Sequence, residues 1–317
     1  MINRFKLFGL MATACIVAVA GCATKPSNEQ PLAYASKPAP TSFSQAPSDR
    51  GLAVQASAFE TFMRHARAIE PSFSGPTDVA QALETGASHE PHELEGGMIA
   101  FVAMVALQEP RFVAAVRADQ SHGELARRLS EDPQAALALP GSEAASARAS
   151  GALYAEGSAL SGEGLRVKQA AYSVQRQAWA RANVADAPGR LSRVKRLSAT
   201  AYRPSGGDAE QLRGELAKST YRAGPASPVV SRGLALAALT VLGQQGRGRA
   251  LMSEPRTDSC LHMAKLNLYQ CLASAGPHYE DIYCLGQHAM IDPGQCVVDA
   301  THRHVQRVAM TKTGAPR

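Results

Sequence analysis

Apolar residues recur along most of the chain at intervals of three and four positions, the spacing that places side chains on one face of an α-helix. Val54, Ala58 and Phe62 show this spacing in the first such segment. Residues 98–107 and 234–242 are apolar at almost every position but too short to cross a bilayer, so they predict two buried helices that pack together. Alternation of β-branched residues is scarce, and the pattern therefore predicts an all-α multi-helix bundle.

Proline and glycine indicate where several of these helices begin and end. Glu70-Pro71, Glu90-Pro91 and Glu109-Pro110 predict three helix starts, because proline is tolerated in a first helical turn and glutamate favours the positive end of the helix dipole. Gly86 is expected to end a short helix, since glycine readily adopts the left-handed conformation that follows a helix.

The second half of the chain begins with a long alanine-rich segment. Pro140-Gly141 separates an N-terminal helical region, residues 52–140, from a C-terminal helical region, residues 141–317. Residues 142–185 predict a long helix, and Pro188-Gly189 is expected to form the turn of a helical hairpin. Three glycines are expected to interrupt the long helix: Gly157, Gly162 and Gly164.

The first residues have the organisation of an export signal. Two basic residues, Arg4 and Lys6, precede an apolar run of 14 residues, 7–20, which has the length of a signal-peptide core and is too short for a mature membrane helix. The run ends in Val19-Ala20-Gly21-Cys22, which resembles the lipobox of bacterial lipoproteins.

This resemblance implies a location and an anchor. It implies removal of residues 1–21, after which Cys22 carries a thioether-linked diacylglycerol and an acyl chain, such as palmitate, on its new amine. Several chains give stable anchoring, because each buried CH₂ contributes about 0.8 kcal/mol. Residue 23 is Ala rather than the Asp of an inner-membrane retention signal, so we expect the protein on the outer membrane, facing the periplasm. Residues 22–51 are rich in proline and serine and predict a disordered tether.

Four of the six cysteines lie near the C-terminus, at positions 260, 271, 284 and 296. Thiols in an oxidising compartment usually form disulfides. Residues 258–296 predict a helical hairpin that turns at Gly276-Pro277, and a second turn at Asp292-Pro293-Gly294 is expected to begin a last helix.

Helix geometry restricts how these cysteines pair. Cys260 and Cys271 lie about 16 Å apart along one helix, whereas bridged Cα atoms lie within about 7 Å, so these two cannot pair. In the hairpin Cys271 comes opposite Cys284, which favours the nested bridges Cys271–Cys284 and Cys260–Cys296. The crossed alternative, Cys260–Cys284 with Cys271–Cys296, requires the chain after Pro293 to fold back.

Two resemblances to known families concern the cysteine hairpin of residues 258–296. Its geometry is similar to the nested helical hairpins of twin-cysteine CHCH proteins, although its spacings are longer. Residues 277–289 (PHYEDIYCLGQHA) resemble a family of uncharacterised alphaproteobacterial envelope proteins. Neither resemblance implies an activity.

Positive charge is concentrated in one stretch of a chain whose formal net charge is +6. Residues 163–203 hold nine basic and two acidic residues. Such a run is usually a solvated face, but it also attracts anionic lipid or an acidic envelope protein. The residues expected to bind such a partner are Arg166, Lys168, Arg176, Arg181, Arg193, Lys195 and Arg196. No nucleic-acid partner is expected, because aromatic interleaving is absent and the protein is exported.

Motifs that reveal a catalytic chemistry are absent: the sequence lacks GxSxG, GxxxxGK[ST], HExxH and CxxC, and no cofactor is expected. No metal is expected either. The histidines that come nearest to a metal-binding pattern are His89, His92, His278 and His288.

The sequence therefore predicts a lipid-anchored envelope protein with a structural or partner-binding role and no catalytic residues. One alternative is an envelope hydrolase that uses Glu90, Glu93 and Glu95, or His278 and Glu280. The other alternative is a metal-binding accessory protein.

We predict that the mature protein begins at Cys22 and carries acyl chains. Because lipidation requires the thiol, Cys22→Ser should abolish it and leave the signal uncleaved. Intact-mass analysis of the membrane-extracted protein measures both changes. A mature chain that starts at another residue, or an unmodified Cys22, would contradict the lipobox interpretation.

Overall fold

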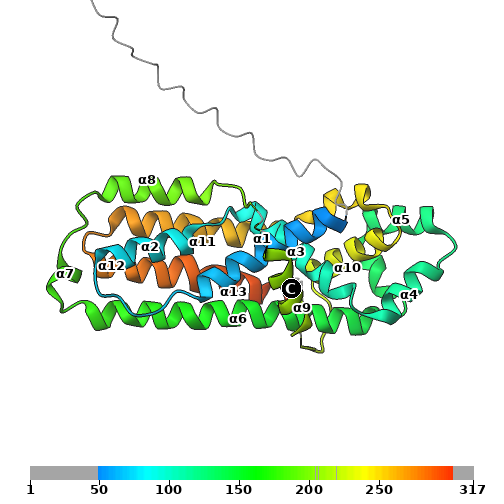
Figure 1. Cartoon of the computed structure of the whole chain (residues 1–317). Coiled ribbons are helices and arrows are strands. Elements are labelled where there is room, and N and C mark those ends of the chain that lie inside the picture. The colour runs from blue at the N-terminus through cyan, green and yellow to red at the C-terminus, as the bar shows by residue number, and fades with distance from the viewer. Residues whose placement is uncertain (1–48, 204, 206, 219, 303–317) are drawn as a thin grey trace, which may run out of the picture. The chain divides into compact units, whose positions relative to one another are not determined.

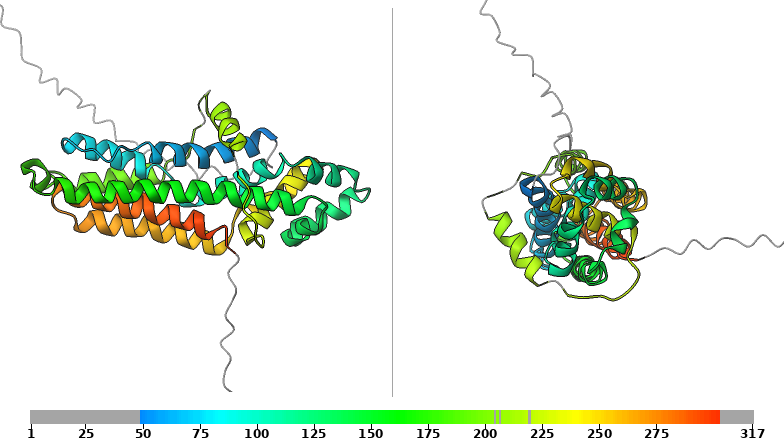
Figure 2. Two further views of the ribbon diagram at one scale, coloured as in Figure 1. Left: turned by 90° about the horizontal axis from the view of Figure 1, so that it is seen from below. Right: turned by 90° about the vertical axis from the view of Figure 1, so that its right-hand side faces the viewer.

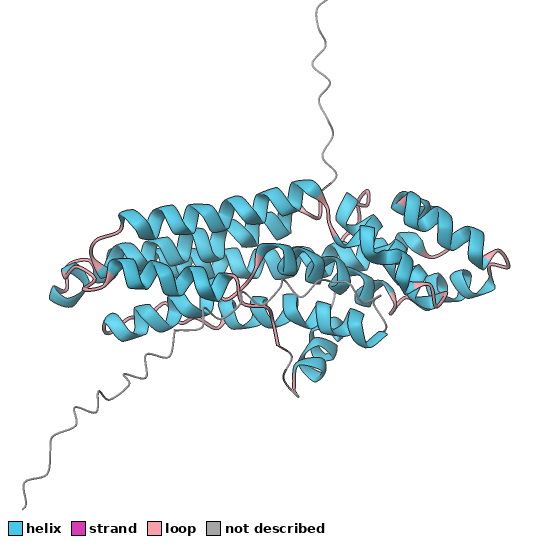
Figure 3. Ribbon diagram, turned by 90° about the horizontal axis from the view of Figure 1, so that it is seen from above, coloured by secondary structure: helices cyan, strands magenta, loops and turns pink. Residues whose placement is uncertain are grey.

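The computed structural model describes residues 49–203, 205, 207–218 and 220–302, and the regular secondary structure in these ranges is helical (Figure 3). An isolated bridge between Asn183 and Pro277 is the one β contact found there. The predicted all-α class is therefore confirmed.

The elements follow one another in a single series (Figure 1). The α-helices are α1 (Asp49–Arg67), α2 (Pro76–Ala87), α3 (Pro91–Ala106), α4 (Pro110–Ala118), α5 (His122–Glu131), α6 (Ser142–Val174), α7 (Ala178–Arg181), α8 (Ala187–Ser198), α9 (Asp208–Ala217), α10 (Pro228–Val241), α11 (Pro255–Ser274), α12 (His278–Cys284) and α13 (Asp292–Asp299). Two 3₁₀ helices, η1 (Pro133–Ala138) and η2 (Gln245–Met252), and a π-helix, η3 (Leu285–Ile291), complete the described order.

Several sequence predictions fall outside these residues. The signal peptide, the tether up to residue 48 and most of the helix predicted after Cys296 are not among them. Within the described part, no single helix is both long and apolar enough to cross a membrane. α3 and α4 reach the required length and composition only together, and they meet at an angle of 89°.

The two most apolar helices, α3 and α10, pack together as predicted, and both are buried along most of their length. Phe101 of α3 also meets Phe59 of α1, with the ring centroids 5.3 Å apart. Helices from both sides of Pro140-Gly141 contribute to this one hydrophobic core.

Proline begins α2, α3, α4, α10 and α11. The predicted starts at Pro91 and Pro110 are right, but the start at Pro71 is wrong. Residues 68–75 are not helical, and the helix begins at Pro76 instead. Asp78 in its first turn accepts hydrogen bonds from the N–H and hydroxyl of Ser74, which holds the preceding loop against the helix start. Gly86 does not end α2 either. It lies inside the helix, where an added Cβ would come within 2.6 Å of Leu285.

α6 is one continuous helix of 33 residues, so the predicted interruption by glycines is wrong. Two of those glycines permit close contact with another backbone instead. An added Cβ would lie 2.6 Å from the carbonyl oxygen of Gly294 at Gly157, and 2.9 Å from that of Gly286 at Gly164. Glycine therefore allows α6 to run directly against η3 and α13 (Figure 2).

The connection after α6 also differs from the prediction. Residues 175–186 form it, and Pro188-Gly189 lies in the first turn of α8 rather than in a hairpin turn. Asp186 caps this turn, because its carboxylate accepts the N–H of Gly189 at 2.9 Å. Proline fits there since its missing N–H would have no intrahelical partner.

The C-terminal hairpin pairs α11 with one continuous helix, residues 278–299, which we call the C-terminal rod. Disulfides join Cys260 to Cys296 and Cys271 to Cys284, each with a Cα–Cα distance of 5.7 Å. The structure thus contains the nested arrangement. The turn predicted at residues 292–294 is wrong, because the helix continues through them. The wider π turns of η3 come just before Pro293, whose missing N–H removes one helical hydrogen bond.

We predict that Gly164→Ala lowers the free energy of unfolding by about 1–3 kcal/mol, because the methyl group overpacks the contact between α6 and the rod. Gly162→Ala is the matched control on the same helix. It has no atom within 4 Å of the added Cβ, so it should raise stability by about 0.5–1 kcal/mol through helix propensity. Denaturant unfolding followed by circular dichroism measures both, and equal effects would contradict the packing account.

Candidate functional site

The predicted basic stretch does not form one continuous surface. Arg190 is buried: its guanidinium pairs with Asp281 of α12 and donates to the carbonyl oxygens of Leu272 and Ala275. This group fixes α8 to the tip of the C-terminal hairpin. Arg166 and Lys168 lie on α6, which packs on the rod, and Arg193, Lys195 and Arg196 lie on α8, which packs on α2 and α11 (Figure 1). The other basic residues of the stretch lie on α7 or outside these helices: Arg176, Arg181 and Arg203.

The α6 part of this stretch combines positive charge with exposed apolar side chains. Leu165 and Tyr172 keep 49% and 56% of their surface exposed. The Tyr172 ring meets that of Tyr283 edge-on, with centroids 6.5 Å apart, and Nζ of Lys168 lies 4.9 Å from the centre of the Tyr283 ring. We call the following six residues the α6 face: Leu165, Arg166, Lys168, Tyr172, Arg176 and Tyr283.

The other predicted partner residues lie on α7 and α8. Arg193 of α8 lies 3.9 Å from Glu84 and 3.8 Å from Asp186, so its charge is partly compensated. Nζ of Lys195 lies 5.6 Å from the centre of the Tyr269 ring. Arg196 is exposed on α8 and Arg181 is exposed on α7.

The acids of the hydrolase alternative have identifiable structural contacts. Glu90 caps α3 by accepting the N–H of Glu93 at 2.7 Å. Both oxygens of Glu93 accept the N–H of Tyr202, at 3.0 and 2.9 Å, which holds the chain before α9 against α3. Glu280 accepts the N–H of Gly276 at 2.8 Å within the hairpin turn.

Two cavities in the described part of the chain are lined by residues other than the acids and histidine of the hydrolase alternative. A cavity of about 420 Å³ lies among η1, α10, α11 and α13, where Ser227, Glu254 and Asp299 contribute polar groups. A second, of about 490 Å³, is bounded by α1 and α2, around His65 and Phe73. Glu90, Glu93, Glu95, His278 and Glu280 line neither of these two cavities.

The four histidines nearest to a metal pattern lie in different surroundings. His89 is buried beside Lys265, with Nδ1 3.3 Å from Nζ, and burial lowers the pKa of that lysine to about 7. His288 contacts Asp292 at 2.7 Å, and His278 begins α12. His92 instead lies 2.8 Å from Asp258 and 3.7 Å from Glu95.

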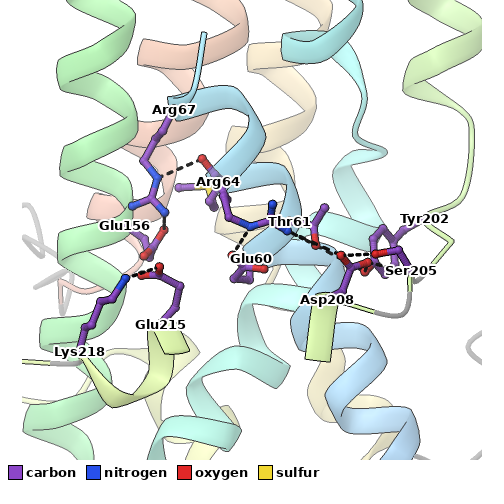
Figure 4. Close-up of polar contacts among 11 residues, drawn as sticks. Glu60, Thr61, Arg64, Arg67, Glu156, Tyr202, Ser205, Asp208, Glu215 and Lys218 are labelled. Carbon is purple, nitrogen blue, oxygen red and sulfur yellow. Dashed lines mark hydrogen bonds and ion pairs between the residues drawn. The ribbon is translucent and has the colours of Figure 1, made fainter. Parts of the chain in front are cut away.

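A partly buried polar cluster between α1, α6 and α9 was not predicted (Figure 4). Glu156 of α6 lies 3.2 Å from Arg67 of α1, and Glu215 and Lys218 lie beside them. A few residues along α1, Arg64 contacts Glu60 at 2.8 Å. Asp208 at the start of α9 accepts hydrogen bonds from Tyr202 and Ser205. These contacts attach α9 to α1 and α6.

The only sequence signal for this cluster is charge on an apolar helix face. Glu156 follows Ala149 and Leu153 and precedes Leu160 at helical spacing, so it occupies a buried position of α6. Burial raises its pKa to about 7, Arg67 lowers it, and Glu215 and Glu60 raise it. The partners come from helices far away in the sequence, and no local motif reveals them.

Comparison with known proteins gives no family: no family model matches the chain, and neither a curated protein nor a solved structure is significantly similar to it. The function is therefore argued from the residues of this chain alone.

We predict that Glu156→Gln stabilises the protein at pH 8 but not at pH 5. The pKa of Glu156 in the fold is about 7, above its usual 4.5. The stability that comes from the neutral carboxyl is therefore fully present below pH 4.5, the usual pKa, and is lost as the pH rises through about 7, the pKa in the fold. A neutral glutamine should raise the free energy of unfolding at pH 8 by up to about 3 kcal/mol.

Denaturant unfolding at both pH values measures this difference. Glu210→Gln on α9, whose side chain is 85% exposed, is the control and should change little at either pH. An equal effect of Glu156→Gln at pH 5 and pH 8 would show that the carboxyl does not titrate as described.

Proposed function

We propose that the protein is a lipid-anchored protein of the cell envelope, facing the periplasm from the outer membrane, whose helical body binds the anionic membrane surface through the α6 face. The sequence Val19-Ala20-Gly21-Cys22 supports the anchor. The observation that supports the contact is the combination of exposed Leu165, Tyr172, Arg166 and Arg176 with half-buried Lys168, on and just after α6.

The residue types of the α6 face suit a lipid headgroup region. Tyrosine and lysine each combine an apolar body with a polar end, so they can bury carbon surface while the polar end stays hydrated. Each Lys or Arg near an anionic membrane contributes about 1 kcal/mol, so Lys168 and Arg176 contribute about 2 kcal/mol. Arg166 adds less, because Glu163 pairs with its guanidinium. This attraction is weak for a free protein.

The anchor makes such a weak attraction sufficient. Of the predicted tether, the 26 residues from 23 to 48 lie between Cys22 and the start of α1 at Asp49. A flexible chain of that length spans about 28 Å on average. A lipid anchor on Cys22 therefore keeps the α6 face at a high effective concentration next to the membrane surface. Anchor and face together favour a body that lies on the membrane.

We predict salt-sensitive binding of the protein to anionic vesicles. A secreted form that begins at Ala23 and carries no lipid should bind phosphatidylglycerol vesicles at low salt and much less at about 0.5 M salt, where screening is strong. Reversal of two charges, Lys168→Glu with Arg176→Glu, should weaken binding at least tenfold. Vesicle flotation measures both effects.

The matched control reverses two exposed charges elsewhere, Arg111→Glu with Arg117→Glu on α4. It changes the net charge equally but should retain most of the binding. Equal losses in the two double variants would show that net charge alone acts. Absence of vesicle binding, with crosslinking of the α6 face to an envelope protein, would replace the membrane by a protein partner.

A further inference from the structure

The first turns of α3 and α11 lie against each other, although His92 and Glu254 are 162 positions apart in the sequence. Glu95 of α3 makes the connection. Its Oε1 accepts the backbone N–H of Glu254 and lies 3.3 Å from the hydroxyl of Ser253. Because these two residues directly precede α11, the contact fixes the start of that helix relative to α3.

Each helix presents one histidine and one carboxylate to this contact. His92 and Glu95 are three residues apart on α3, and Asp258 and His262 are four residues apart on α11, so each pair lies on one face of its helix. Nδ1 of His92 lies 2.8 Å from Asp258 Oδ1 and 3.7 Å from Glu95 Oε2. Nδ1 of His262 lies 3.2 Å from the same oxygen of Asp258.

These distances match the spacing of ligands around one small metal ion. Zinc binds imidazole nitrogen and carboxylate oxygen at about 2.0–2.2 Å in tetrahedral geometry, which places neighbouring ligand atoms about 3.3 Å apart. The three observed separations lie on both sides of that value. The ligand atoms of His92, Glu95 and Asp258 are all within 4.8 Å of one another.

The surroundings of the Glu95 carboxylate favour a cation beside it. Its side chain is fully buried, and Oε2, the oxygen that faces His92, has no hydrogen-bond partner. A buried carboxylate oxygen without a partner is costly, and a coordinated cation offsets that cost. Hydrogen bonds from Glu254 and Ser253 to the other oxygen orient the carboxylate, as outer contacts do at metal sites.

The opposite side of the group is open to solvent. The side chains of His92 and His262 are 57% and 47% exposed, and that of Asp258 is 27% exposed. An ion can therefore reach the ligands without unfolding of the helices. Two imidazoles with two carboxylates suit a divalent transition ion rather than Ca²⁺ or Mg²⁺, which prefer oxygen ligands alone.

We propose that His92, Glu95 and Asp258, with His262 as a fourth ligand, form a binding site for a divalent transition-metal ion of the zinc type. A bound ion joins α3, the centre of the core, to α11 of the disulfide-bonded hairpin. It therefore stabilises the folded protein, because the ligands are far apart in the unfolded chain. This site is separate from the α6 face and does not depend on the membrane proposal.

Calorimetry with ZnCl₂ and the untagged secreted form beginning at Ala23 tests the site. We expect one Zn²⁺ per chain with micromolar affinity or tighter, a higher melting temperature with the ion, and no binding of Mg²⁺. His92→Ala and Glu95→Gln should each weaken Zn²⁺ binding at least tenfold, and His262→Ala should weaken it less. His122→Ala, an exposed histidine on α5, is the control and should bind as the original protein does.

Glu95 is buried, so its variant could fail to fold. His92 is exposed, so His92→Ala should fold normally, and circular dichroism should show an unchanged helix content. A loss of Zn²⁺ binding by this variant then reports on the site and not on the fold. Replacement of Zn²⁺ by Co²⁺ gives a second readout, since tetrahedral coordination by nitrogen and oxygen produces a visible absorption band. Absence of stoichiometric Zn²⁺ binding, or equal binding by His92→Ala and the control, would overturn the proposal.

Discussion

Two disulfide bonds between α11 and the C-terminal rod set the positions on which much of the described structure depends. They bridge residues 36 and 13 positions apart, and loop closure alone gives such bridges about 4 and about 3 kcal/mol. One bridge lies near each end of the hairpin, so the register of the two helices is fixed. The contacts of α6 with Gly286 and Gly294 require that register, because a shifted rod would place larger side chains against the α6 backbone.

The same hairpin organises the polar chemistry. Asp281 at its tip holds the buried guanidinium of Arg190, and the start of α11 meets Glu95 of α3. Buried ion pairs of the first kind are expected to be structural, since removal of one partner leaves an uncompensated charge. Two places differ in their access to solvent: the α6 face, which exposes Leu165 and Tyr172, and the carboxylate of Glu95, whose unpartnered oxygen lies beside the exposed side chain of His92. Those two places therefore carry the proposals about binding.

Periodicity and spacing predicted the all-α class, the pairing of α3 with α10 and the nested cysteines. They did so because helical repeat and rise determine which side chains share a face and how far apart two cysteines lie. The same rules failed at Gly164, Pro188 and Pro293. Glycine either breaks a helix or permits close packing, and proline either starts a helix or is accommodated within one. The tertiary partner decides, and a single sequence does not show it.

The candidate sites were likewise predictable where the signal is local in the sequence, and not where it depends on tertiary partners. The basic residues of α6 were visible as a charge run, but burial removed Arg190 from it. His92 was visible beside its neighbouring acids, whereas Asp258 and His262 lie far along the chain, and only their spacing of four on a helix could have drawn attention to them. The Glu156 cluster had no comparable signal, because its charged members come from three helices far apart in the sequence, α1, α6 and α9.

The pairing of the cysteines is the feature on which the other described contacts depend most, and peptide mapping of the unreduced protein tests it. Digestion followed by mass spectrometry should yield one linked pair of peptides that contains Cys260 and Cys296, and another that contains Cys271 and Cys284. Crossed pairs, or four free thiols, would contradict the fixed register of the C-terminal hairpin and the contacts that depend on it.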